Sequence, residues 1–237
     1  MDKLQSFTAL CVALFIFPFL PSAANAQAAA QDSLQRLLEN HPGQDDRRAD
    51  LLNQLSYQLQ FSDPEQGLRL AQEVIDFADR LKDNQLLYRA YGEKANNLLQ
   101  LARYYDALKS AQKALEGFET TGSKIDIAFC HSTIGIIYNH LNNYPKALES
   151  LQQSAKLLRE EGHSQESTMY LNMARIYGER KQYDKAQEYL TQANAKAVEH
   201  GNQLLQTYCA FNMATLKLET GAPTEGRKLL DSALVLA

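Results

Sequence analysis

The side chains best suited to metal binding or proton transfer in this chain are its five histidines, His41, His131, His140, His163 and His200. Only His131 and His140 fall within one expected helix. Their nine-residue separation places them about 180° apart around that helix, because each residue of an α-helix turns by about 100°. The two rings cannot reach one ion together. The spacing therefore predicts no metal site.

The acidic pairs and the sequence motifs predict no catalytic centre either. Asp45 and Asp46 suit the positive end of a helix dipole, whereas Glu160 and Glu161 are expected to lie in water at a helix end. The sequence contains no glycine-rich phosphate loop, nucleophile elbow or zinc-protease motif. We therefore expect neither an enzyme nor a bound cofactor.

A turn that recurs at a fixed interval indicates how the remaining side chains must be held. Gly67, Ala107, Ala147 and Ala186 follow such turns at steps of 40, 40 and 39 residues, and Gly226 stands 40 residues further on. A repeat that cannot bury its own apolar face must stack on its neighbours. The period therefore predicts an open superhelix that presents a long binding surface.

Each repeat is expected to contain two antiparallel helices. Apolar and small residues recur at helical spacing between the turns, and Gly122, Gly162 and Gly201 stand where a helix C-terminus favours a left-handed residue. The first helices are predicted near residues 45–60, 84–101, 123–141, 163–180 and 202–219. The repeats that contain them are predicted over residues 45–83, 84–122, 123–162, 163–201 and 202–237.

The N-terminal residues form a separate unit. Lys3 precedes an apolar run from Phe7 to Leu20, and the small residues of Ala24-Asn25-Ala26 match a secretory cleavage site. We predict a signal peptide over residues 1–26, with cleavage after Ala26 and an exported, periplasmic or extracytoplasmic mature chain without a membrane span. The alternative is an uncleaved membrane anchor.

The segment that follows, residues 27–44, is expected to shield the first repeat. Asp32 and Ser33 are typical helix-capping residues, and they predict a short cap helix from Leu34 to Asn40 that ends before Pro42.

The C-terminal residues leave an apolar helix face open. By the period, the last helix should reach a glycine about four residues past Ala237, and we expect Leu229, Leu230, Leu234 and Leu236 to have no polar capping helix over them. Two interpretations follow. Either the chain continues in a longer protein, or this face is a partner surface, self-association included.

Charge and cysteine content narrow the classes of partner. The formal net charge is −4 and no block of basic residues occurs, which argues against nucleic acid or an anionic membrane as the main ligand. Cys130 and Cys209 occupy equivalent places two repeats apart, several helix layers from each other, so we expect no disulfide between them. Both are predicted to be small buried side chains.

Several of these positions resemble the tetratricopeptide repeat. The resemblance rests on the small residues Ala95, Gly135, Ala174 and Ala214 of the first helices, the aromatic residues Tyr138 and Tyr177 three positions after two of them, the tyrosine of the turn and the alanine that begins the second helix. It covers roughly residues 45 to 237, and the step of 39 to 40 residues resembles the family's longer-helix variety, as in kinesin light chains. The resemblance implies an all-α, right-handed α-α superhelix of about five helix pairs. Repeats one and five depart from the pattern at Leu55, Gly67, Lys217 and Gly226.

A second resemblance involves the start of the array. The segments Asp32-Ser33-Leu34, Leu51 to Ser56 and Ser62 to Glu65 are similar to N-terminal repeat regions of bacterial sensor histidine kinases and related regulators. This implies an extracytoplasmic input region of a signal-transduction protein. The alternative is a self-contained periplasmic adaptor or scaffold in envelope assembly or transport, and sequence beyond Ala237 would discriminate the two.

The tetratricopeptide resemblance also implies that a peptide or protein partner, of unknown identity, binds on the concave face. That face is lined by the first helix of each pair, along positions spaced four, three and four apart. Our hypothesis is a groove with an apolar anchor flanked by arginines, which suits a hydrophobic residue near carboxylates. The alternative is a solvated surface with Phe129 folded against its neighbour. The candidate residues are Arg89, Asn96, Gln100, Phe129, Ile136, His140, Asn172, Arg175, Glu179, Tyr208 and Asn212.

Overall fold

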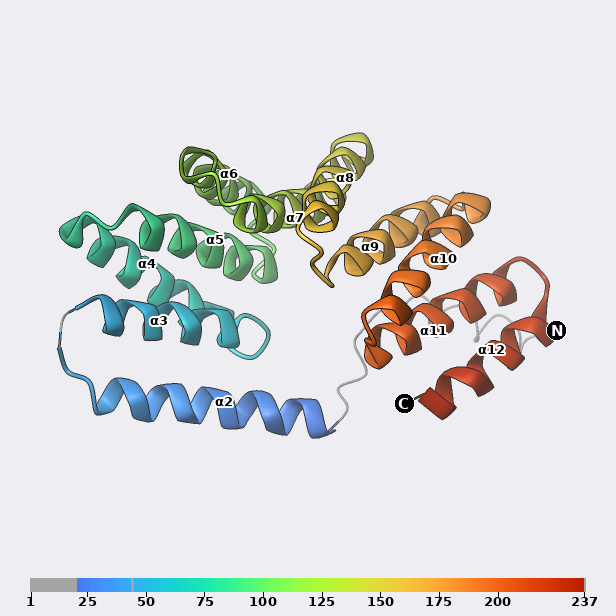
Figure 1. The fold of residues 1–237 in the computed structure, drawn as a ribbon, viewed down its shortest axis with the longest axis horizontal. Coiled ribbons are helices and arrows are strands. Elements are labelled where there is room, and N and C mark those ends of the chain that lie inside the picture. The colour runs from blue at the N-terminus through green and yellow to red at the C-terminus, as the bar shows by residue number, and fades with distance from the viewer. Residues whose placement is uncertain (1–20, 44, 237) are drawn as a thin grey trace.

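In a computed structural model that describes residues 21–43 and 45–236, the chain forms eleven helices, and this part of the chain contains no strand. The helices stack side by side into an open α-α superhelix that curves as an arch (Figure 1). Their bounds are α2 Pro21–Glu39, α3 Asp46–Leu59, α4 Pro64–Leu81, α5 Asn84–Gln100, α6 Tyr104–Thr121, α7 Lys124–His140, α8 Tyr144–Glu160, α9 Glu166–Glu179, α10 Tyr183–Glu199, α11 Gln203–Glu219 and α12 Pro223–Leu236.

The helices from α3 to α12 form the five antiparallel pairs that the period predicts. Four of the five first helices begin and end within one residue of their predicted bounds. The exception is α9, which begins at Glu166 and not near residue 163, because Gly162 closes α8 in a left-handed conformation and the next residues form a turn. This all-helical repeat architecture is the predicted fold class.

Left-handed residues close the helices at two places in each of the three middle repeats and at one place in the first and the last repeat. Gly122, Gly162 and Gly201 have φ of 73°, 65° and 64° at the ends of second helices, as predicted, and Lys82 takes the same role with φ of 58°. The turns inside the pairs are closed by another left-handed set, Ala102, Asn142, Lys181 and Gly221. After each residue of this second set, the next backbone N–H donates to a carbonyl five residues back, which satisfies a helix end that would otherwise lack partners.

Small residues allow the two helices of a pair to approach closely. A Cβ added to Gly135 would lie 3.1 Å from the carbonyl oxygen of Ala147, and one added to Gly226 would lie 2.9 Å from that of Ala214. Ala95 and Ala174, which occupy the position of Gly135 in the second and fourth repeats, are buried. The core therefore runs as a string of clusters between neighbouring helices, as expected of a repeat array.

The N-terminal helix differs from its prediction. Helix α2 begins at Pro21, so Asp32 and Ser33 lie exposed in its middle and do not cap a helix at Leu34. The physical reason is the alanine-rich run before Asp32, since alanine is the strongest helix former. The predicted cleavage site after Ala26 therefore lies inside α2, while residues 1–20 of the predicted signal peptide lie outside the described residues.

Helix α2 is held to the first pair at its middle and at its C-terminal turn. The side-chain amides of Gln27 and Gln31 each donate to the backbone oxygen of Gln58 over 2.8 Å, and Arg48 Nη1 donates to the backbone oxygen of Leu38 over 3.4 Å. The N-terminal end of α2 reaches under the middle of the arch (Figure 1). It thus forms one edge of the concave side.

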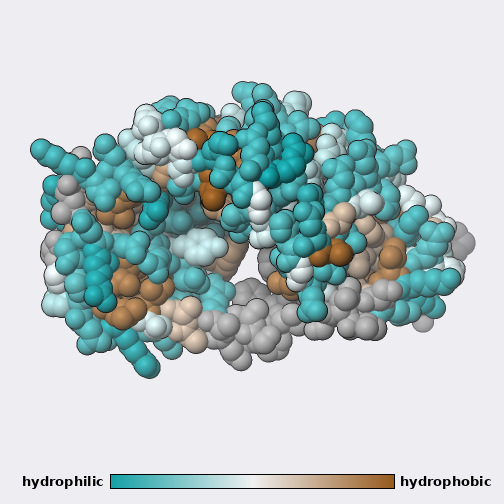
Figure 2. Space-filling view, viewed as in Figure 1, coloured by the Kyte–Doolittle hydropathy of each residue, from teal (hydrophilic) through white to brown (hydrophobic). Residues whose placement is uncertain are grey.

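The surface on view in Figure 2 is largely hydrophilic, with scattered apolar residues and a hollow near its centre. Among the described residues, no helix combines the length and the apolar character that a membrane span requires.

Candidate functional site

The concave face is lined by the first helices of the pairs, as the family resemblance implies. Helices α3, α5, α7, α9 and α11 each contact the next one in this series, whereas no such contact joins the second helices of the described array. Elements on the inner side of a curved stack lie closer together than those on the outer side. The predicted binding residues therefore lie on the inner helices.

A cavity of about 210 Å³ opens on this face between α3, α5 and α7. It brings together three of the predicted residues, Arg89, Asn96 and Phe129. Asn53, Glu93 and Thr133, which belong to the same predicted stripe but are not among the named candidates, line it too. The cavity therefore lies along the predicted stripe, and the named candidates supply two of its six polar lining residues.

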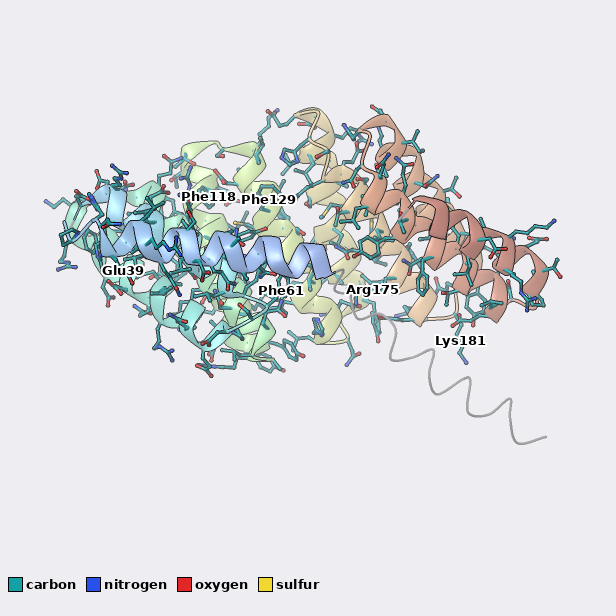
Figure 3. The ribbon with its side chains drawn as sticks, turned by 90° about the horizontal axis from the view of Figure 1, so that it is seen from below. Glu39, Phe61, Phe118, Phe129, Arg175 and Lys181 are labelled. Carbon is teal, nitrogen blue, oxygen red and sulfur yellow. The ribbon has the colours of Figure 1, made fainter. Side chains whose placement is uncertain are left out.

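Sequence reasoning missed part of the lining. Asp126, from the first turn of α7, and Phe118 and Cys130, from the core beneath, border the cavity as well. Their contribution depends on how α6 and α7 cross, which one helix period does not reveal. Figure 3 shows Phe118 and Phe129 close to one another.

A chain of polar contacts crosses the cavity wall. Thr133 Oγ1 on α7 donates to Asn96 Oδ1 on α5 over 3.1 Å, and Asn96 Nδ2 donates to Glu93 Oε2 over 3.3 Å. On α3, Asn53 is nine-tenths buried, and its Oδ1 has no hydrogen-bond partner among the described residues. The wall therefore retains hydrogen-bonding capacity that the protein itself does not use.

Glu93 has the most perturbed acidity of this wall. Burial beneath the neighbouring helices raises the pKa of Glu93 from 4.5 to about 7, and the hydrogen bond from Asn96 opposes that rise only in part. Its side chain is partly buried in the inner face of α5. A carboxyl group that changes charge near neutral pH in a cavity is a candidate functional group. Only its three-dimensional surroundings distinguish it from other acids of the chain.

Phe129 packs against neighbouring side chains and also lines the cavity. Its ring meets the His163 ring edge to face, with 5.6 Å between the centroids, and it packs against the core cluster of α8 and α9. The ring still lines the cavity, and the residue is only partly buried. Phe129 is therefore a fixed apolar wall of the cavity.

His140, Arg175 and Glu179 form a separate group further along the face. The His140 ring stacks on Tyr104 with 5.0 Å between centroids, and burial followed by the charge of Arg175 lowers the pKa of His140. Arg175 Nη1 lies 3.5 Å from Glu179 Oε1. Arg175 does not line the cavity of Phe129, so the two arginines of the hypothesis do not flank one pocket.

The other predicted residues extend the inner surface without joining either group. Gln100 is exposed at the end of α5, while Ile136 on α7 and Asn172 on α9 are partly buried. On α11, Asn212 Nδ2 donates to the backbone oxygen of Tyr208 over 2.7 Å. These residues lie along the array and not around one centre.

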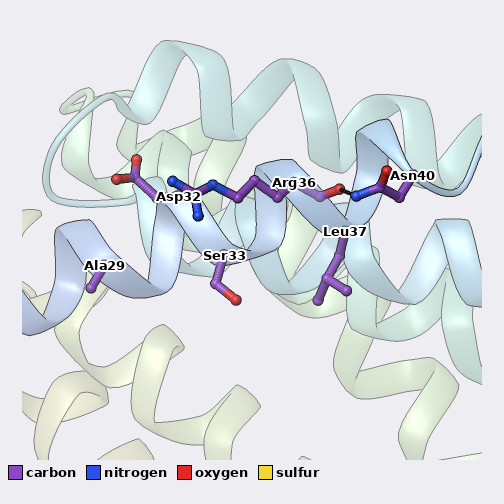
Figure 4. Close-up of a pocket in the computed structure, with 6 residues that line it drawn as sticks. All are labelled: Ala29, Asp32, Ser33, Arg36, Leu37 and Asn40. Atoms are coloured by element: carbon purple, nitrogen blue, oxygen red, sulfur yellow. Dashed lines mark hydrogen bonds between the residues drawn. The ribbon is translucent and has the colours of Figure 1, made fainter.

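A larger hollow of about 340 Å³ lies along α2 (Figure 4), but it is not a comparable site. Residues of α2 and the adjoining Asn40 supply its whole lining, and Leu37 there is 42% exposed. A face of one helix encloses nothing. We therefore place the candidate site between α3, α5 and α7, where several helices converge.

The potential metal ligands and thiols are dispersed. The described residues contain no group of three or more histidine, cysteine or acidic side chains that could hold a metal ion. Cys130 and Cys209 are both buried and unbridged in separate core clusters, as the repeat position predicts, and burial raises the pKa of each thiol to about 12.

Comparison with known families identifies the repeat. A family model described as tetratricopeptide repeat matches residues 86–160 and 131–197. A second, described as anaphase-promoting complex subunit 5, matches residues 22–92 and 169–237. No curated protein sequence matches this chain.

Solved structures with the same fold are numerous and distant in sequence. A Rap protein complexed with competence and sporulation factor is 20% identical with a TM-score of 0.77, over 89% of this chain and 61% of that one. A putative kinesin light chain from Podosopora anserina with TPR-like repeats is 14% identical with a TM-score of 0.65, over 80% of this chain and 94% of that one. The quorum sensor NprR from B. thuringiensis is 17% identical with a TM-score of 0.63, over 95% and 62%. At such identities the likeness establishes the fold alone.

Proposed function

Because the chain belongs to the tetratricopeptide-repeat proteins, we propose that its concave face binds a peptide or protein partner and that its role is recognition without turnover. The observation that supports this most directly is the cavity between α3, α5 and α7, which joins an apolar wall at Phe129 to unused hydrogen-bonding capacity at Asn53. An extended or helical segment supplies both apolar side chains and backbone donors.

We also propose that the chain is the input region of a bacterial signalling protein. Two proteins of the same fold support this: the Rap protein was solved with competence and sporulation factor bound, and NprR is described as a quorum sensor. The array spans about three fifths of each of those proteins. An output region in the remaining length is part of the proposal.

Export through the predicted signal peptide completes the proposal. Its support is the apolar run and the small residues before Gln27. Expression of the whole reading frame in a bacterial host, followed by N-terminal sequencing of the periplasmic product, tests it. We expect the mature chain to begin at Gln27; an intact N-terminus on cytoplasmic protein would overturn the export proposal.

Binding is tested by selecting peptides from a random displayed library on the purified chain. Selected peptides should bind the Phe129→Ala variant at least tenfold more weakly, because that change removes the apolar wall. The Arg175→Glu variant tests how far the binding surface continues along the face. Tyr105→Ala is the matched control, because Tyr105 is 78% exposed on α6, a second helix.

The outcomes separate clearly. Loss of affinity in Phe129→Ala with none in Tyr105→Ala supports recognition on the concave face. Unchanged affinity in both Phe129→Ala and Arg175→Glu would remove this groove as the binding site.

A further inference from the structure

The cavity between α3, α5 and α7 is asymmetric in the hydrogen bonds and charges that it offers. Its polar wall carries the carboxyl groups of Glu93 and Asp126 and the unpartnered side-chain oxygen of Asn53, all of which accept hydrogen bonds. Thr133 gives its proton to Asn96, and Asn96 gives one of its two amide protons to Glu93, so part of the donor capacity of the wall is already engaged. Two carboxyl groups in the lining of one cavity favour an occupant that brings a positively charged donor.

Arg89, the one cationic residue among those that line the cavity, is more exposed than the hydrogen-bond acceptors. Arg89 is exposed, whereas Glu93 is partly buried and Asn53 is nine-tenths buried. Among the described residues Arg89 forms no ion pair with Glu93 or Asp126. The charged groups that line the cavity around Glu93 are thus Arg89 from its own helix and Asp126 from α7, while α3 and α6 contribute Asn53, Ala111 and Phe118, which are uncharged.

From this arrangement we infer that the cavity recognises a basic side chain of the bound peptide, an inference that rests on the proposed function. The aliphatic part of a lysine lies along Phe129 and Phe118, and its ammonium group donates to the carboxyl group of Glu93. The exposed guanidinium group of Arg89 can pair with a carboxylate elsewhere on the partner. A carboxylate inside the cavity would instead meet two acids and an unpartnered oxygen.

Binding of the ammonium group is coupled to a proton. Where Glu93 carries its proton, the carboxyl group must release that proton to the buffer before it accepts a hydrogen bond from the cation. With the pKa of Glu93 near 7 in the free chain, about nine-tenths of the carboxyl is charged at pH 8 and about one-tenth at pH 6. Affinity for the basic peptide should therefore fall about tenfold between pH 8 and pH 6.

The test uses the same random displayed library, selected at pH 8 on the wild-type chain and on Glu93→Gln. The wild type should enrich lysine or arginine at one position, and Glu93→Gln should lose that enrichment while still binding. Glu116→Gln is the matched control, since Glu116 is exposed on the outer helix α6. Urea unfolding of each variant shows that the fold is retained.

A small probe tests the cavity without a peptide. N-acetyl-lysine methylamide should shift the NMR signals of Phe129 and of the Glu93 carboxyl carbon, whereas N-acetyl-norleucine methylamide, which has the same aliphatic length and no charge, should not. The lysine effect should weaken about tenfold from pH 8 to pH 6, by the same fraction of charged Glu93.

The two proposals fail in different ways. Peptides that depend on Phe129 but show no basic preference, or equal shifts with both amides, would overturn the basic pocket and leave peptide binding in place. A library that yields no sequence dependent on either Phe129 or Arg175 would overturn the proposed function, and with it this inference.

Discussion

Asn97 occupies the space that a side chain at Gly67 would need: a Cβ added to Gly67 would lie 2.1 Å from Asn97 Oδ1. Asn97 Nδ2 also donates to Ser56 Oγ over 3.1 Å, and Ser56 Oγ donates to the backbone oxygen of Gly67 over 2.8 Å. In the next repeats the equivalent pairs are apolar, Ala107 with Ile137 and Ala147 with Ile176. The first repeat therefore replaces an apolar contact by a buried polar one.

This exchange predicts strong coupling between the two positions. Gly67→Ala and Asn97→Ile alone should each destabilise the chain by about 1 to 3 kcal/mol, through a clash and through lost hydrogen bonds respectively. The double variant recreates the pair of the next repeat and should lose at least 1 kcal/mol less than the sum. Urea unfolding measures the cycle, and additive losses would show that the two sites are independent.

Two glycines inside inner helices should respond in opposite directions to the same substitution. A Cβ at Gly135 would lie 2.8 Å from Leu151 Cγ, so Gly135→Ala should destabilise the chain by about 1 to 3 kcal/mol. A Cβ at Gly178 would meet nothing within 4 Å, so Gly178→Ala should stabilise α9 by about 0.5 to 1 kcal/mol. Thermal unfolding compares them, and equal effects would contradict the close packing at Gly135.

Ionisation of the Glu93 carboxyl group should lower the free energy of unfolding as the pH rises. Its pKa is higher in the folded chain, about 7, than the ordinary 4.5, so the folded state holds the extra proton between these values and stability falls as pH rises through them. Glu93→Gln should match the wild type at pH 4 and exceed its free energy of unfolding at pH 8 by about 1 to 3 kcal/mol, a range reduced because the carboxyl is only partly buried. A constant difference across this pH range would contradict the buried acid.

Removal of the Gln31 side-chain amide should loosen the attachment of helix α2 without affecting the rest of the array. Gln31 Nε2 donates to the backbone oxygen of Gln58 and to Ser62 Oγ, so Gln31→Ala removes two links and should cost about 1 kcal/mol locally. Hydrogen exchange should become several-fold faster over residues 27–39 and stay unchanged in α5 and α7. Gln35→Ala, at an exposed position of the same helix, is the control. Faster exchange in α5 would show that α2 supports the inner face.

The repeat period predicted most of the fold because small residues and turn glycines recur where the packing needs them. Gly122, Gly162 and Gly201 were placed correctly, yet Lys82, Ala102 and Lys181 adopt the same left-handed conformation without a residue type that indicates it. The start of α2 was wrong, because Asp32 and Ser33 have the composition of a cap but lie inside an alanine-rich helix. The capping preference of Asp32 and Ser33 was outweighed there by the helix propensity of the alanines before them.

The candidate site was predictable as a surface and not as a cavity. Helical spacing placed Arg89, Asn96 and Phe129 on one face, and the structure assembles all three around one opening. The place of Asp126 in the lining and the raised pKa of Glu93 both depend on which residues of three separate helices converge. The spacing of residues within one helix does not predict that convergence. Such a pocket becomes visible only when the stacking is known.

The left-handed corners at Lys82, Gly122, Gly162 and Gly201 hold successive pairs in register through backbone geometry. These corners add a backbone contribution to the curvature of the arch that no side chain in its hollow has to supply. Inward positions without a packing role can therefore be exchanged while the frame stays the same, so that one architecture can change its ligand by a few replacements along α5 and α7.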